Sequence, residues 1–212
     1  MILTGIRPIN LSNLKWSYVT DNEIIYPATT IGLRGAMKNQ REFRIPITPQ
    51  IRIILDEQNE WRLAAGDRCS QEYVFLQPRN PMLAFSKRTV WILIREYSPE
   101  DCLFGDFNDN TVKGRDGAFP TMCRKFLKTN VIVQMRKNGY SRQDARETSQ
   151  LCMHHVNDIK KDDPMSAHYD FSDEFLHEEM ALKRTAFELH ERSILAQIAL
   201  IRSQKQKKLR NV

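Results

Sequence analysis

The chain has 212 residues, which is enough for one large domain or two small ones. Hydrophobic residues make up 41% and charged residues 27%, and a chain of this composition can bury a core of its own. No apolar run approaches the roughly 18 residues that a membrane span needs, and no signal-peptide pattern opens the chain. These properties exclude a membrane-spanning class, and we expect a soluble intracellular protein.

Charge and cysteine content narrow the classes further. The net charge of +6 fits a polyanionic partner such as nucleic acid, although many basic proteins bind nothing acidic. The four cysteines form no C-x-x-C pair, so a zinc ribbon is not expected. Cys123 and Cys152 fall within apolar helical patterns and are predicted to be small core residues. No disulfide is expected.

Short elements are predicted along the first half of the chain. The apolar start ending at Gly5 resembles the last turn of a helix, and we therefore expect a fragment of a longer protein. A short helix is predicted over 8–15, followed by strands over 16–19 and 23–26. Residues 43–47 alternate like a strand whose proline favours an edge position.

The next signals alternate between helix and strand. Thr48 before Pro49 predicts a helix start, with an N-cap followed by proline at the first position. A short strand is predicted over 73–76 and a serine-capped helix over 86–97. Residues 99–118 hold three glycines among aspartates and asparagines, which indicates a loop or an insertion.

Helices dominate the second half of the chain. One helix is predicted up to Gly139, a second from Ser141 to Met153, and a long third one from Ser172. A basic tail follows. The pattern as a whole predicts a mainly helical α+β domain with a small antiparallel sheet near the N-terminus.

Arg7 is the first candidate site residue. It follows a helix-ending glycine, where an arginine is held rigidly and can clamp a phosphate through paired hydrogen bonds. An isolated arginine in a turn is more often a plain surface residue. Residues 3–16, L-T-G-I-R-P-I-N-L-S-N-L-K-W, nevertheless resemble the first arginine box of the tyrosine recombinases, which is T-G-hydrophobic-R, a helix and L-x-W. Asn10 stands where the family normally has glutamate.

Lys38 is the second candidate. It lies in a polar turn before the strand 43–47, and on its own it would be a solvated turn lysine. The turn, the strand and the I-P-hydrophobic-T start of the next helix resemble the family's hairpin with its catalytic lysine. The resemblance implies that Lys38 is the general acid that donates a proton to the leaving 5′ oxygen.

The family's second box is H-x-x-R on a helix, and T-M-C-R occupies it here. Arg124 matches the arginine, while Thr121 replaces the histidine. A threonine hydroxyl can still bind a phosphate by hydrogen bonding, but it cannot carry the charge of a protonated histidine. Alternatively, Thr121 is simply the N-cap of its helix.

A histidine box follows in the family pattern, and L-C-M-H-H matches it in order. We choose His154 as the site residue because two apolar residues then fill the preceding positions, and His155 remains a second candidate. Met153 stands where a small residue is usual, and the spacing from Arg124 is longer than expected. Exposed histidines at a helix end are the alternative. A metal site is less favoured, since adjacent histidines on a helix point in different directions.

Tyr169 is the candidate nucleophile. A phenol with a pKa near 10 is a poor nucleophile until cations and a base surround it, and two arginines, a lysine and a histidine could supply them. The gap between His154 and Tyr169 is longer than usual, and the polar stretch 157–164 accounts for the extra length.

The resemblance extends from residue 3 to about residue 195. It implies the tyrosine recombinase (DNA breaking-rejoining) catalytic fold over 1–212, with the N-terminal core-binding domain absent and a C-terminal helix and basic tail over 172–212. The implied activity is site-specific DNA cleavage and rejoining through a 3′-phosphotyrosyl bond, as in type IB topoisomerases, with no cofactor and no metal. The implied partners are double-stranded attachment-site DNA and further copies of the chain, forming a tetramer in the cytoplasm of a bacterium.

Two alternatives stay open at this point. Thr121 and the lengthened spacings fit an integrase-like DNA-binding protein whose catalytic site has decayed. A helical protein–protein interaction module with chance matches to the motifs would instead leave Arg7, Lys38, Arg124 and Tyr169 scattered in space.

Overall fold

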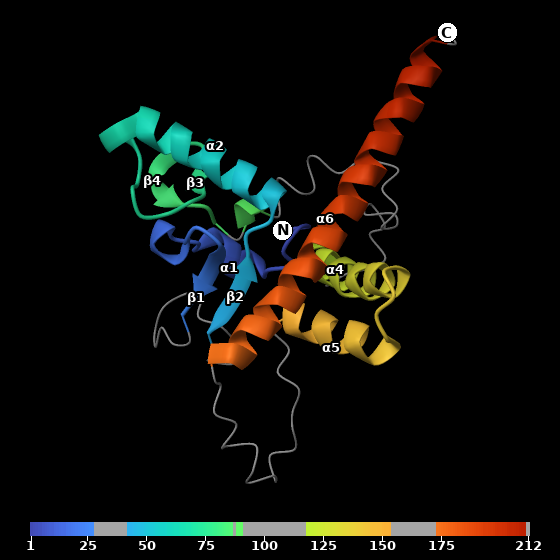
Figure 1. Cartoon of the computed structure of the whole chain (residues 1–212). Coiled ribbons are helices and arrows are strands. Elements are labelled where there is room, and N and C mark those ends of the chain that lie inside the picture. Colours follow the sequence, from blue (N-terminus) through green and yellow to red (C-terminus); the bar gives the residue numbers. More distant parts are fainter. Residues whose placement is uncertain (28–41, 87, 91–117, 154–172, 211–212) are drawn as a thin grey trace.

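The computed structural model describes residues 1–27, 42–86, 88–90, 118–153 and 173–210 (Figure 1). Within these ranges the chain is mainly helical and has two antiparallel sheets of two strands each. The expected mainly helical α+β class with a small antiparallel sheet near the N-terminus is therefore confirmed, and a second small sheet is present beside the expected one. No described helix has the length and apolar character that a bilayer span requires.

The first five residues form the predicted helical turn. The Gly5 amide donates to the Met1 carbonyl oxygen at 2.8 Å, and Gly5 has a φ of 57°. Leu127 on α4 (Ala118–Lys137) packs directly against this glycine, so that a Cβ at Gly5 would lie 2.5 Å from the leucine Cδ2. Gly5 is thus required both by its backbone conformation and by the close approach of α4.

α1 (Pro8–Ser12) begins where the sequence predicts it, but the expected strand over 16–19 is wrong. This segment forms a 3-10 turn, η1 (Trp16–Tyr18), in which the Val19 amide donates to the Trp16 carbonyl oxygen at 3.0 Å. The cause is tertiary: the Trp16 ring lies under the guanidinium of Arg62, 4.8 Å from the ring centroid. This packing overrides the strand propensity of the local residues.

The predicted antiparallel strand pair is confirmed. β1 (Glu23–Tyr26) pairs with β2 (Phe43–Pro46), and Ile24 lies opposite Ile45. One face of the pair is buried, as the alternation predicts. The second sheet, β3 (Leu76–Gln77) with β4 (Asn80–Ala84), corresponds only in part to the strand expected over 73–76.

α2 (Pro49–Ala65) starts at the predicted Thr48 and Pro49, but its capping group comes from elsewhere in the chain. Thr48 caps none of the helix amides with its own side chain and instead donates its hydroxyl hydrogen to Glu191. The other carboxylate oxygen of Glu191 accepts from the Gln50 amide at 3.1 Å. A carboxylate on α6 (Asp173–Arg210) therefore caps the N-terminus of α2.

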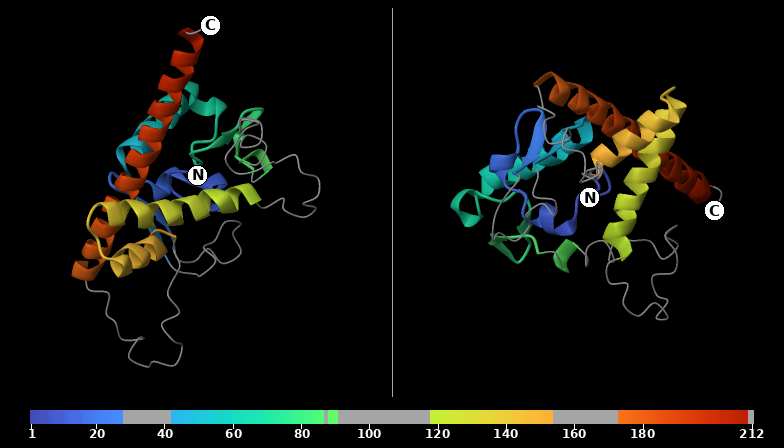
Figure 2. Two further views of the ribbon diagram at one scale, coloured as in Figure 1. Left: turned by 90° about the vertical axis from the view of Figure 1, so that its right-hand side faces the viewer. Right: turned by 90° about the horizontal axis from the view of Figure 1, so that it is seen from below.

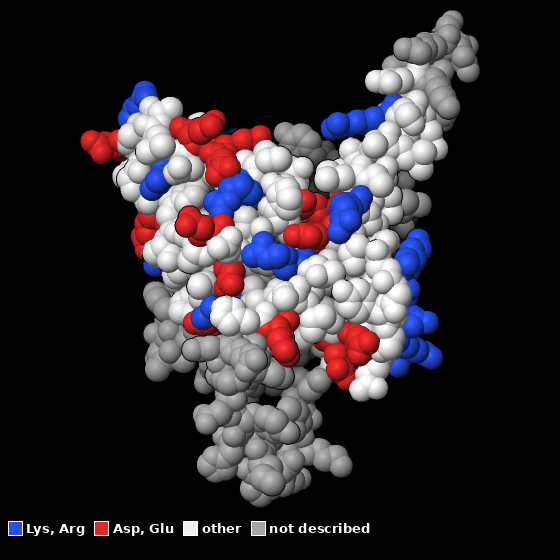
Figure 3. All heavy atoms as spheres, in the orientation of Figure 1, with Lys and Arg blue, Asp and Glu red and all other residues white. Residues whose placement is uncertain are grey.

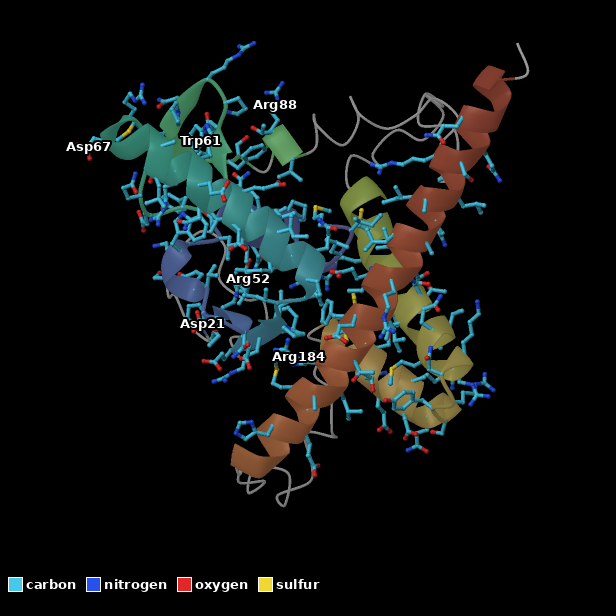
Figure 4. All side chains as sticks on the ribbon, turned by 45° about the horizontal axis from the view of Figure 1, so that its top comes forward. Asp21, Arg52, Trp61, Asp67, Arg88 and Arg184 are labelled. Atoms are coloured by element: carbon cyan, nitrogen blue, oxygen red, sulfur yellow. The ribbon has the colours of Figure 1, made fainter. Side chains whose placement is uncertain are left out.

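Two arginines tie the ends of the β1–β2 pair to the helices (Figure 4). Arg52 on α2 donates to the Asp21 carbonyl oxygen. Arg184 on α6 donates to the carbonyl oxygens of Ile47 at 3.3 Å and Asn22 at 3.1 Å. The strand pair is thus held between α2 and α6.

The helices α4, α5 (Arg142–Cys152) and α6 pack together on the other side of the fold (Figure 2). Ser141 caps α5 in a complete capping box with Asp144, as its position predicts. At the end of α4 the Tyr140 amide bonds the Met135 carbonyl and the Gly139 amide bonds that of Arg136, which is a Schellman motif around a glycine with a φ of 90°. The far end of α6 extends away from the rest of the molecule (Figure 1).

Other sequence predictions are met in part. Ser86 caps a helix, since its hydroxyl accepts from the Thr89 amide at 2.9 Å, but only residues 86 and 88–90 of the expected 86–97 are described. The loop or insertion predicted over 99–118 lies outside the described residues except for residue 118, and the polar stretch 157–164 lies wholly outside them. Cys123 and Cys152 are buried, as predicted.

A buried histidine joins three segments within the core. His190 on α6 contacts the Ile2 carbonyl oxygen through Nε2 at 2.9 Å and the Asn130 amide nitrogen through Nδ1 at 2.8 Å. A carbonyl can only accept, so Nε2 carries the hydrogen; the Asn130 oxygen accepts from Gln134, so its nitrogen donates to Nδ1. The network therefore holds the neutral imidazole, and burial lowers the pKa of His190 from its usual value.

We predict that Gly5→Ala lowers the free energy of unfolding more than Gly139→Ala does. Both substitutions impose a positive φ on alanine, at a cost of about 1–2 kcal/mol, but only the first also drives a methyl group into Leu127. Urea denaturation of the two variants measures the difference. Equal losses would contradict the packing role of Gly5.

A second prediction concerns pH. Below about pH 6.5 the unfolded chain binds a proton at His190 and the folded chain does not, so stability falls as the pH drops towards the lowered folded pKa. The free energy of unfolding should therefore decrease less steeply between pH 7 and 5.5 in His190→Gln than in the wild type. His177→Gln, at an exposed histidine, serves as the control and should retain the wild-type slope.

Candidate functional site

Arg7 is positioned by the residues on both sides of it. Gly5 ends the first turn with a positive φ, and Pro8 restricts its predecessor to extended backbone, so that Arg7 has φ −68° and ψ 144° as the N-cap of α1. The Arg7 carbonyl accepts from the Asn10 and Leu11 amides, which fixes the peptide that carries the side chain. The side chain itself is half-buried.

Arg124 lies on α4 and connects distant segments. Its Nη1 donates to the Gly5 carbonyl oxygen at 2.5 Å, and its Nη2 donates to the Met153 carbonyl oxygen at 3.2 Å. Gly5 precedes Arg7 by two residues, and Met153 is the C-cap of α5. The guanidinium therefore lies where the first turn of the chain, α4 and the end of α5 meet.

The charges of the two arginines act on each other. Burial lowers the pKa of Arg124 to about 10, and the positive charge of Arg7 lowers it as well. Within the described part of the chain, neither guanidinium forms an ion pair with a carboxylate. The arrangement thus holds two cations whose charges act on each other and are not compensated by any carboxylate among the described residues, which is favourable for an anion that bridges them.

Thr121 belongs to the same helix as Arg124. The alternative that Thr121 caps this helix is wrong, because α4 begins at Ala118, three residues earlier. Residues three apart on a helix share a face, so position 121 lies one turn before Arg124 on the side where the candidate site is. The side chain of Thr121 is outside the described part of the structure.

The remaining candidates, Lys38, His154, His155 and Tyr169, lie outside the described residues. The structure therefore places two of the sequence-predicted residues, Arg7 and Arg124, and brings them together.

Metal and thiol chemistry find no support in the described ranges. These contain no group of three or more histidine, cysteine or acidic side chains that could hold a metal ion. The thiol of Cys152, next to Met153, is fully buried, and burial raises its pKa to about 12. A thiol in this state is a packing group and a poor nucleophile.

The acceptors of Arg124 could not be inferred from the sequence. Both are backbone carbonyls, and they lie 119 and 29 residues away from it along the chain. The one available signal is the terminal position of each: Gly5 ends a helical turn and Met153 ends a helix, where carbonyls lack helical partners.

No family model, curated protein or solved structure matches this chain. The interpretation of the site therefore depends on the residues themselves.

We predict that sulfate stabilises the wild-type protein and stabilises Arg7→Gln less. At a tenfold excess over its dissociation constant, an anion that binds only the folded state adds about 1.4 kcal/mol. Thermal unfolding at rising sulfate, with ionic strength held constant by chloride, measures the effect. Arg68→Gln, an exposed arginine far along the chain, is the control. Equal stabilisation of all three proteins would show that the arginine pair is not an anion site.

Proposed function

We propose that this chain is the catalytic domain of a tyrosine site-specific recombinase, an integrase that cuts and rejoins double-stranded DNA. The observation that carries the proposal is the hydrogen bond from Arg124 to the Gly5 carbonyl oxygen, two residues before Arg7, which brings the charges of both arginines within range of each other. These are the two arginines that the motif resemblance assigns to one phosphate, and they come from opposite halves of the chain. An interaction module with chance motif matches gives no reason for the two to meet.

The charges and hydrogen bonds of the site suit phosphoryl transfer. A guanidinium binds two phosphate oxygens through a pair of parallel hydrogen bonds. Two of them offset the charge that builds up on the pentacovalent phosphorus, and because they are already in place they need little reorganisation during the reaction. The bonds of Arg124 to two carbonyls fix its orientation while leaving its positive charge available to the phosphate.

In the proposed reaction, the Tyr169 phenolate attacks the scissile phosphorus. A bond forms between the phenolic oxygen and phosphorus, and the bond between phosphorus and the 5′ oxygen breaks. Lys38 gives its proton to the departing 5′ oxygen, and His154 assists by hydrogen bonding or proton transfer. In the reverse step a 5′ hydroxyl of another strand gives its proton to the deprotonated Lys38 and attacks the phosphorus, and the bond between phosphorus and the phenolic oxygen breaks, which releases the tyrosine. The covalent bond conserves the energy of the phosphodiester, so neither a nucleotide nor a metal ion is needed.

The proposal also includes the partners and the setting. The substrate is duplex attachment-site DNA in the cytoplasm, and two pairs of strands are exchanged by a tetramer of this chain. Binding should weaken steeply with salt, because lysine and arginine contacts to phosphate release counterions.

A second candidate is an integrase-like DNA-binding protein that no longer cuts. The observation in its favour is Thr121, a neutral residue at the position of the family's histidine, on the same face of α4 as Arg124. The two candidates share DNA binding and differ in covalent capture.

A nicked suicide substrate, whose 5′ fragment diffuses away after cleavage, separates the two candidates. We expect the wild type to form a covalent protein–DNA adduct that survives denaturation, and Tyr169→Phe to form none while binding the same DNA. Tyr140→Phe removes one hydroxyl elsewhere and should form the adduct at the wild-type level. An adduct that persists in Tyr169→Phe would refute the assignment of the nucleophile, and a wild type that binds DNA without any adduct would favour the decayed protein.

A further inference from the structure

α4 has an unusual charge composition. Its 20 residues include no aspartate or glutamate but several lysines and arginines, namely Arg124, Lys125, Lys128, Arg136 and Lys137. Arg124 belongs to the candidate site, and the other four side chains are exposed. The helix therefore contributes a concentrated part of the net charge of +6.

Three of these cations line one side of the helix. Successive residues turn by about 100°, so Lys125, Lys128 and Arg136 fall within a narrow arc. The buried Leu127 and Val131 lie outside this arc and pack in the core. At a rise of about 1.5 Å per residue, this row of cations extends over roughly 16 Å.

The row of cations starts at the candidate site. Lys128 follows Arg124 by four residues, so the two side chains are neighbours on the helix surface. Position 121 precedes Arg124 by one turn on the same side. A polyanion held by Arg124 would therefore meet Lys128 next as it extends along α4.

In the part of the chain that the structure describes, no carboxylate neutralises these cations. Among the described residues, none of the ion pairs includes Lys125, Lys128 or Arg136. Arg136 donates to the Tyr140 carbonyl oxygen at 2.9 Å and keeps its charge. α2 differs, because it carries acidic residues between its two arginines, and Arg52 lies 3.9 Å from Asp56. Figure 3 shows this mixture of signs on the face that carries α2.

We propose that the exposed face of α4, formed by Lys125, Lys128 and Arg136, binds the phosphodiester backbone of duplex DNA beside the scissile phosphate. The inference rests on the proposed function and deepens it by naming the surface that holds the flanking DNA. A straight row of cations matches a regular line of phosphates. A membrane surface fits less well, because a helix that binds a bilayer needs a broad apolar face beside its basic one, and the apolar face of α4 is buried in the core.

The test compares Lys125→Gln/Lys128→Gln with Arg68→Gln/Arg79→Gln. Each double variant removes two exposed positive charges, in the first case from the α4 face and in the second from the β3–β4 side of the molecule. Affinity for a duplex of about 30 base pairs is measured at several salt concentrations by fluorescence anisotropy. Each lost phosphate contact lowers the slope of log affinity against log salt by about 1, so we expect a decrease of about 2 for the α4 variant and none for the control.

Each outcome bears on the inference in a defined way. An unchanged slope in the α4 variant would overturn the inference, while adduct formation by the wild type on the suicide substrate would leave the proposed function standing. Equal decreases in both double variants would also overturn it, since they would show a response to net charge alone. A wild type that neither binds duplex DNA nor forms an adduct would refute both proposals. A loss of binding to vesicles of anionic lipid, without a change on DNA, would assign the surface to a membrane.

Discussion

The guanidinium of Arg124 holds together the part of the molecule from which the candidate function follows. It bonds the carbonyls of Gly5 and Met153, so a single side chain fixes the first turn of the chain and the end of α5 on α4. Carbonyl acceptors satisfy its hydrogen bonds without cancelling its charge, and Arg7 adds a second cation nearby. Holding like charges half-buried is unfavourable in the free protein. An anion that binds both removes the repulsion, which is why such pairs are typical of phosphate sites.

α6 supplies the rigid support behind this arrangement. Lys183 pairs with Glu179 at 2.5 Å and lies over the Phe43 ring at 5.5 Å, which joins α6 to β2. Farther along, His190 holds the first turn and α4, while Glu191 caps α2. Adjacent residues of one helix point in different directions. His190 and Glu191 can therefore bind different segments, the first turn with α4 and the start of α2, from neighbouring positions on α6. The short strands and the helices are thus fixed relative to each other with little sheet structure between them.

Local signals in the sequence predicted those parts of the fold that local chemistry decides. Ser141 with its capping box and Gly139 with its Schellman motif appear where the sequence places them, because each depends on residues within one turn. The prediction failed at Trp16, whose conformation follows from its contact with Arg62 on another element. The cap that Glu191 supplies to α2 could not be predicted either, because the carboxylate is 141 positions away in the sequence from the Gln50 amide that donates to it. At the candidate site, the motif resemblance selected Arg7 and Arg124, but only the folded chain shows that backbone carbonyls hold Arg124.

The contacts of His190 and Glu191 also determine when the tertiary fold can form during synthesis of the chain. The Ile2 carbonyl and the N-terminus of α2 obtain their partners from His190 and Glu191 on α6, far along the sequence from both of them. While these residues are still inside the ribosome, the nascent chain cannot form the contacts that fix its first turn. The entropic cost of closing these long loops is therefore met only late in folding. The arginine pair is therefore assembled only after α6 has been synthesised, so a prematurely terminated product that lacks this helix is left without an ordered site.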